Sequence, residues 1–232
     1  MNIDTATLGA TVTAIGALGL AACALVDTSK TLPGGGVSKV GFACIEAAVN
    51  LFLPPAPGAP LMPNLAGSFL YTLHANWISG MAAADQKAVA KSLIKLRLTP
   101  ETSGQYATVT QVDPAVLAEV ARRMTTGAAL EAQHTNALGR FDLALTAILD
   151  AAYQRADQRY RNFSRLWAAV MSLILAGLGG FAIADPKLAY LGTSQMWLAL
   201  FCGLLAVPLA PITKDLTSAL TAGVKMAQSL KR

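Results

Sequence analysis

The chain of 232 residues has little charge and few aromatic side chains. Charged residues make up 13% and aromatic residues 6% of the sequence, whereas hydrophobic residues make up 54%. Together with a mean hydropathy of +0.48, this balance lies outside the usual range of soluble domains. The shortage of charge therefore excludes an ordinary soluble domain and predicts an integral membrane protein.

Cysteine and histidine are too few and too scattered to build a redox or metal site. The three cysteines, Cys23, Cys44 and Cys202, are odd in number and have no paired spacing, which argues against a disulfide framework or a thiolate cluster. His74 falls on an apolar helical face, and His134 has no cysteine or glutamate at ligand spacing. We expect no metal and no cofactor.

Signatures of catalysis are also lacking. The stretch LPGGGVSK is glycine-rich and carries a lysine, but it does not have the spacing of a phosphate-binding loop. The carboxylates are scattered singly, and two histidines offer no compelling Ser/His/Asp order. We therefore predict that the chain is not an enzyme.

Three apolar stretches approach the length needed to cross a bilayer, which is roughly 20 helical residues. They cover residues 6–26, 166–184 and 196–212, and none contains Asp, Glu, Lys, Arg or His. An ion or proton relay usually needs an ionisable group at membrane depth, so proton-coupled transport is disfavoured. Pro208 and Pro211 are expected to bend or end the third stretch.

The distribution of lysine and arginine predicts the topology, because basic flanks resist translocation. Of the 18 basic residues, 13 lie between the first two stretches, four follow the third, and the loop at 185–195 holds only Lys187. We therefore expect most of the chain in the cytoplasm, at a bacterial inner membrane, with the N-terminus outside. The tetrapeptide LAAC at 20–23 looks like a lipoprotein cleavage box, but MNIDTAT has no basic residue, so this segment is expected to remain a membrane helix.

The predicted fold is an all-α integral membrane protein with three transmembrane helices, a helical cytoplasmic region and a long stalk helix continuous with the second span. Its parts, in chain order, are the first transmembrane helix, the cytoplasmic helical region, the stalk, a transmembrane hairpin and a cytoplasmic amphipathic tail. They cover 1–27, 28–126, 127–165, 166–212 and 213–232. Thr213 is expected to cap the tail helix.

Within the cytoplasmic region, residues 37–53 are predicted to form a helix that is apolar over most of its circumference. It is either a core helix of this region or a helix in the lipid headgroup layer. The headgroup placement is favoured because only a three-glycine turn separates it from the first span. Asp85 and Asp113 are expected to cap later helices, and Pro114 strengthens the second of these start signals.

Lys87, Lys91 and Lys95 are spaced by four residues, so they form one basic ridge on a helix. Such a ridge suits anionic lipid headgroups or nucleic acid phosphates, but no aromatic residues interleave for stacking on bases. A solvated helix face is the plain alternative, and nucleic acid binding is not expected. The expected partners are membrane lipids and either further copies of the chain or another membrane protein.

Two patterns predict helix association. The first is an apolar seam along the stalk with steps of three and four residues, relaxed by a stutter near Ala156, which favours a coiled coil. It consists of Leu138, Phe141, Leu145, Ile148, Ala152, Ala156, Tyr160 and Phe163. The second is a set of small residues at four-residue spacing, which lets spans approach closely within a subunit or between subunits. It consists of Ala168, Ser172, Ala176, Gly180, Ala184, Ala199 and Gly203.

These patterns predict a non-enzymatic homo-oligomeric scaffold or pore-like assembly, with an accessory subunit of a larger membrane complex as the alternative. In topology and length, the layout resembles the proton-channel subunits of bacterial inner-membrane motors that energise outer-membrane transport. That resemblance implies a motor or channel-like subunit of stator topology. It also implies hydroxyl groups lining a pore in the last two spans, where AVMSLILAGLGGFAIA offers only Ser172.

Overall fold

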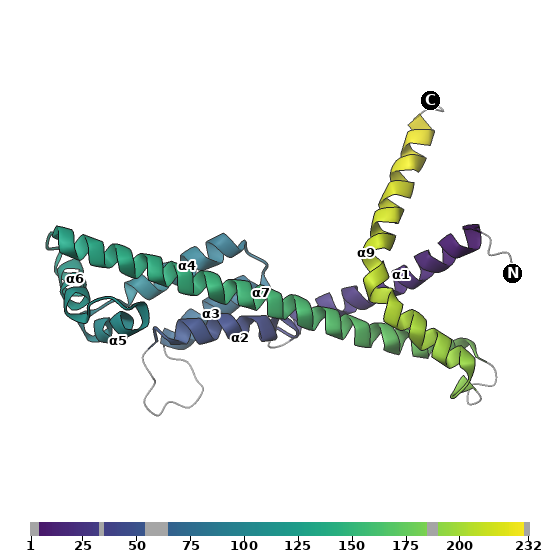
Figure 1. The fold of residues 1–232 in the computed structure, drawn as a ribbon, viewed down its shortest axis with the longest axis horizontal. Coiled ribbons are helices and arrows are strands. Elements are labelled where there is room, and N and C mark those ends of the chain that lie inside the picture. The colour runs from purple at the N-terminus through teal and green to yellow at the C-terminus, as the bar shows by residue number, and fades with distance from the viewer. Residues whose placement is uncertain (1–4, 33–34, 54–64, 185–189, 230–232) are drawn as a thin grey trace. The chain divides into compact units, whose positions relative to one another are not determined.

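A computed structural model describes residues 5–32, 35–53, 65–184 and 190–229 (Figure 1). Within these ranges all regular secondary structure is helical, which confirms the all-α class. Three helices are long and apolar enough to cross a membrane, at Thr11–Thr31, within Ala132–Ile183 and at Ser194–Asp215. Their length and composition indicate a membrane protein with transmembrane helices. The chain divides into two compact units, which we call the membrane unit and the helical unit.

The membrane unit comprises Met1–Val37 and Arg161–Arg232. It contains α1 (Thr5–Thr28), a short 3-10 helix (Ser29–Thr31), the C-terminal part of α7 (Ala132–Ile183) and α9 (Ser194–Ser229). α7 is one continuous helix, as the absence of a helix breaker between stalk and second span predicts. α1 packs along α9.

α9 remains helical through Pro208 and Pro211. Of the two outcomes expected for these prolines, termination does not occur, whereas Figure 1 shows that α9 changes direction part-way along its length. Each proline removes one N–H donor and crowds the preceding turn, which bends a helix. The expected cap at Thr213 is wrong, because Thr213 lies inside α9 and is buried. Most side chains of the predicted amphipathic tail lie outside the described residues.

The helical unit, Ser38–Tyr160, holds α2 (Ser38–Asn50), α3 (Leu65–Ile78), α4 (Ala83–Leu96), α5 (Pro100–Thr110), α6 (Pro114–Thr126) and the N-terminal part of α7. Its apolar core draws side chains from all six helices. α2 contributes Phe42, Ile45 and Val49, and Phe52 lies two residues beyond its end. This burial supports the core-helix interpretation of 37–53 over the headgroup placement preferred from the sequence.

The start of α6 confirms the predicted cap. The Asp113 carboxylate accepts backbone N–H bonds from Ala115 at 2.9 Å and Val116 at 3.1 Å, and Pro114 occupies the first helical position. The expected cap at Asp85 is wrong, because Ala82 is the N-cap of α4. Asp85 lies instead in the first turn, where a carboxylate interacts favourably with the helix dipole.

The stalk helix begins later than the predicted 127. Gly127 ends α6 with a φ of 73°, a left-handed conformation that favours glycine, and α7 starts at Ala132. Nδ1 of His134 accepts a hydrogen bond from the backbone N–H of Glu131 at 3.2 Å. This bond satisfies one of the backbone donors left open at the start of α7. The His134 side chain is buried.

Candidate functional site

The small residues on α7 and α9 hold these two spans of one chain together. The Ser172 hydroxyl is fully buried and donates to the carbonyl of Gly203 on α9. A Cβ atom at Gly203 would lie 2.9 Å from both the Ala176 Cβ and the Ser172 carbonyl oxygen, which is closer than side chains normally approach. The ridge therefore serves packing within a subunit, one of the two roles that its spacing allows.

The remaining members of the ridge lie around this contact. Ala168 is buried on α7, and a Cβ atom at Gly180 would lie 2.7 Å from the ring carbon that carries the Tyr190 hydroxyl. Ala184 and Ala199 are partly exposed. The close approach thus centres on Ser172, Ala176 and Gly203.

α1 and α9 approach each other through glycines as well. A Cβ atom at Gly16 would lie 2.5 Å from the Cβ of Thr213, and one at Gly19 would lie 2.5 Å from the carbonyl carbon of Ala206. Gly16 and Gly19 are three residues apart in the sequence, but the sequence does not show which helix covers them. α9 thus contacts both α1 and α7, and small residues allow the close approach of the helices at both contacts.

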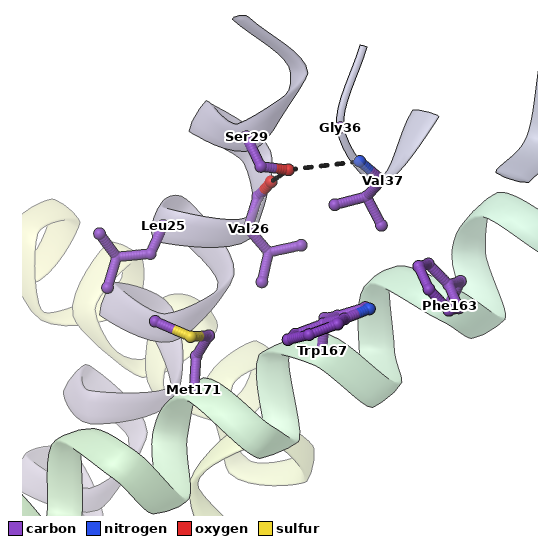
Figure 2. A pocket seen from close by; sticks show the side chains of 8 residues that line it. All are labelled: Leu25, Val26, Ser29, Gly36, Val37, Phe163, Trp167 and Met171. Atoms are coloured by element: carbon purple, nitrogen blue, oxygen red, sulfur yellow. Dashed lines mark hydrogen bonds between the residues drawn. The ribbon is translucent and has the colours of Figure 1, made fainter. Parts of the chain in front are cut away.

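An apolar pocket of about 430 Å³ lies in the membrane unit, between the C-terminal end of α1 and the face of α7. Its lining residues are Leu25, Val26, Ser29, Gly36, Val37, Phe163, Trp167 and Met171. Figure 2 shows Val26 and Val37 pointing toward Trp167. Phe163, the last residue of the predicted stalk seam, lies here and makes an edge contact with Trp167 at 6.1 Å between ring centres.

The pocket offers shape and apolar surface but no reactive group. The Ser29 hydroxyl donates to the Val26 carbonyl at 2.6 Å and accepts from the Val37 N–H at 3.5 Å (Figure 2). Its volume falls within the usual range of small-molecule sites, roughly 300 to 1,000 Å³. Because the pocket belongs to the unit with the spanning helices, it can take up an acyl chain or an apolar side chain of a partner.

The lysine ridge on α4 is ion-paired with α7. Lys87 lies 2.5 Å from Asp150, Lys91 lies 2.5 Å from Asp142, and Lys95 also contacts Asp142. The lysines are therefore engaged inside the chain, and contact with an anionic surface stays a prediction. The sequence carries a signal for this pairing, because Asp142 and Asp150 are eight residues apart, as are Lys87 and Lys95.

Asp142 makes this contact dependent on pH. Burial raises the pKa of Asp142, but hydrogen bonds and charge from Lys91 and Lys95 more than offset this and hold its pKa below its usual range. A pKa that is lower in the folded than in the unfolded chain stabilises the fold above the unfolded value of about 3.9. That stability is lost as the pH falls through the folded pKa.

We expect Asp142→Asn to lower the free energy of unfolding of the helical unit by about 1 kcal/mol at pH 7, a typical value for a partly exposed ion pair. The difference from the parent chain should shrink as the pH falls below 4, where the carboxylate becomes protonated. Denaturant titrations in detergent at a series of pH values measure both effects. Glu46→Gln, at an exposed position of α2, is the control, and equal stability of Asp142→Asn and Glu46→Gln at pH 7 would contradict the prediction.

The stalk seam is buried against helices of the same chain. Phe141, Leu145, Ala152 and Ala156 are buried, and Leu138 and Ile148 are partly buried. All but Ala152 belong to the core of the helical unit or pack against it. Tyr160, near the end of the seam, makes an edge contact with Trp77 at 6.3 Å between ring centres.

The seam is wider than its spacing indicates. Leu149 and Tyr153 are also buried and belong to the core. A broad stripe is typical of a helix packed against several neighbours, whereas a coiled coil needs only a narrow seam. No second copy of the chain is needed to bury it.

Comparisons of the chain with protein-family models, curated proteins and solved structures find no match. Among the described residues, no group of three or more His, Cys, Asp or Glu side chains could hold a metal ion. The geometry of the two units is therefore the basis for a functional proposal.

Proposed function

We propose that the chain is a non-enzymatic membrane scaffold that works as an accessory subunit of a larger membrane complex. The supporting observation is that the surfaces expected to join copies of the chain are occupied inside it. The Gly203 carbonyl accepts a hydrogen bond from the Ser172 hydroxyl, and Phe141 and Leu145 lie in the core of the helical unit. The remaining apolar surface is available to lipid or to a different protein.

A pore-like homo-oligomer or a motor subunit of stator topology has less support. Ser172 supplies the one hydroxyl of the second predicted span, and it is buried and bonded to Gly203. A hydroxyl that is 0% exposed between two helices of one chain does not line a water-filled path. We therefore place Ser172 in the hairpin and not in a conduction route.

Partners within the membrane would meet α9 and the apolar pocket. Trp197, Leu198, Phe201 and Leu204 are exposed along α9, and in a bilayer these side chains would face lipid or the helix of another protein. Aromatic residues near the ends of spans also suit the membrane interface.

The test is the composition of the particle extracted from native membranes. The tagged chain, solubilised in mild detergent, should run well above its own mass on a native gel, together with one or more other proteins in fixed ratio. The same chain, expressed and purified without its partners, should run at a lower mass than the native particle. A native particle built only from copies of this chain would contradict the proposal and support the homo-oligomer.

The proposed topology gives a separate prediction. Single cysteines introduced at Lys95 and Arg232 should be shielded from an impermeant thiol reagent in intact cells, whereas one at Thr193 should react, because the basic regions stay in the cytoplasm. The parent chain with its own three cysteines supplies the background signal. Labelling at Lys95 from outside would overturn the orientation.

A further inference from the structure

A second cavity lies in the helical unit, between α2 and α7. Its volume is about 540 Å³. The lining residues are Ala43, Cys44, Ala47, Ala48, Leu51, Ile148, Arg155, Gln158 and Arg159. We call it the arginine groove, because its floor is apolar and its polar edge carries two arginines.

The groove results from small residues on α2. Gly41 meets α7 closely, since a Cβ atom there would lie 2.8 Å from the carbonyl oxygen of Ala156 and 3.1 Å from the Cβ of Tyr160. This contact fixes the spacing of the two helices. Further along α2, Ala43 and Ala47 are exposed, and their short side chains leave the space open.

Neither arginine has a carboxylate partner among the described residues. Arg155 donates to the Ala151 carbonyl of its own helix, at 3.1 Å. Asp150 is paired with Lys87, and Asp157 is two residues from each arginine, which places it on the other side of the helix.

The two arginines are four residues apart on α7. Like charges at this spacing repel each other and weaken the helix. An anion bound between Arg155 and Arg159 would remove that repulsion, and guanidinium groups match carboxylate geometry well. The groove therefore favours a ligand with one negative end.

We propose that the arginine groove binds the carboxylate of a single-chain fatty acid, with the acyl chain on the alanine floor. The charged end lies between Arg155 and Arg159, and the chain covers Ala43 and Ala47. A bare phosphate would leave this floor unused, and a diacyl lipid keeps its chains in the bilayer. A single-chain fatty acid, unlike a diacyl lipid, dissolves in water at a useful concentration and can reach a groove outside the bilayer.

Cys44 supplies a natural reporter, since it lines the groove and carries a free thiol. The full chain in nanodiscs of zwitterionic lipid is alkylated with and without decanoate, and each cysteine is followed by peptide mass spectrometry. Decanoate should slow alkylation of Cys44 severalfold, and decanol at the same membrane concentration should not. Cys23 and Cys202, in predicted spans, report any general effect on the bilayer.

Varying the length of the fatty acid tests the apolar floor of the groove, and removing the arginine charges tests its polar edge. Apparent affinity, expressed in the free aqueous concentration of the fatty acid, should rise about fourfold for each added methylene until the floor is filled. Replacing both arginines by glutamine should weaken protection at least about tenfold, because charge-assisted bonds are lost. Arg140→Gln, also exposed on α7, is the charge control and should bind as the parent chain does.

Filling the groove provides a test that leaves the charge intact. Ala47→Phe should abolish protection of Cys44 by decanoate, while Ala147→Phe, at an exposed position of α7 outside the groove, should not. Circular dichroism confirms that both variants are folded. Equal protection by decanol, protection by inorganic phosphate alone, or no protection by any chain length would overturn the proposal. Protection only in nanodiscs of anionic phospholipid would also overturn it, in favour of a lipid headgroup.

Discussion

Replacing Gly19 by leucine is expected to part α1 from α9 and to lower the free energy of unfolding of the membrane unit by about 3 kcal/mol. Overpacking of a tight contact typically costs about 1–3 kcal/mol, and a rigid backbone neighbour places this contact at the upper end of that range. The added side chain would meet the backbone of Ala206, with its Cβ 2.5 Å from the carbonyl carbon. A backbone atom cannot rotate away, so the helices themselves must move. Denaturation in mixed detergent micelles, followed by circular dichroism, measures the loss.

Gly179→Leu is the matched control for this substitution. Gly179 lies within α7, and a Cβ atom there would meet nothing within 4 Å. Glycine is a poor helix former, by about 1 kcal/mol relative to alanine, so this variant should be as stable as the parent chain or more stable. Equal stability of Gly19→Leu and Gly179→Leu would show that α1 and α9 are not closely packed.

Phe141→Ala is expected to destabilise the helical unit by about 4 kcal/mol, the usual cost of removing a buried phenylalanine. Phe141 is 0% exposed, and its ring stacks on that of Tyr106 at 6.0 Å between centres. The cavity would lie in the core that α7 shares with the other helices of this unit. Hydrogen exchange across the helical unit, as a function of denaturant, measures the loss region by region.

Leu143→Ala serves as the control for Phe141→Ala. Leu143 is two residues away on the same helix but is 72% exposed, so its truncation should change stability by less than about 0.5 kcal/mol. A seam that joined copies of the chain would behave differently. In that case Phe141→Ala would dissociate an assembly and leave the isolated helical unit as stable as before, which contradicts burial in its core.

Local signals in the sequence predict much of the fold. The three apolar stretches, the continuous helix through the second span and the start of α6 at Asp113 and Pro114 each depend on neighbouring residues alone. Hydropathy and capping chemistry are short-range properties, so a single sequence carries them.

What covers each apolar face could not be predicted. The spacing from Leu138 to Phe163 requires burial on one side of a helix, but a second copy or the same chain satisfies it equally. Residues 37–53 raised the same problem, since a bilayer interface and a protein core both accept an apolar helix. The long-range contacts of Phe42, Ile45 and Val49 decide in favour of the core.

The prolines of α9 show a second limit of sequence reasoning. In a soluble helix, Pro208 and Pro211 would be expected to end the helix, because each removes a backbone hydrogen bond. Spanning helices tolerate proline where neighbouring helices and local adjustments satisfy the freed groups. The close approach of Gly19 to Ala206 places α1 beside this part of α9, a contact that no local pattern in α9 reveals.

The central claim is that the stalk seam and the small-residue ridge pack within a single chain. The mass of the purified protein tests this claim most directly. Native mass spectrometry after release from detergent, over a hundredfold range of concentration, should find a single chain of 24.1 kDa. The proportion of larger species should not rise with concentration. A fixed multiple of this mass that persists on dilution would mean that copies associate through surfaces assigned here to the chain's own interior.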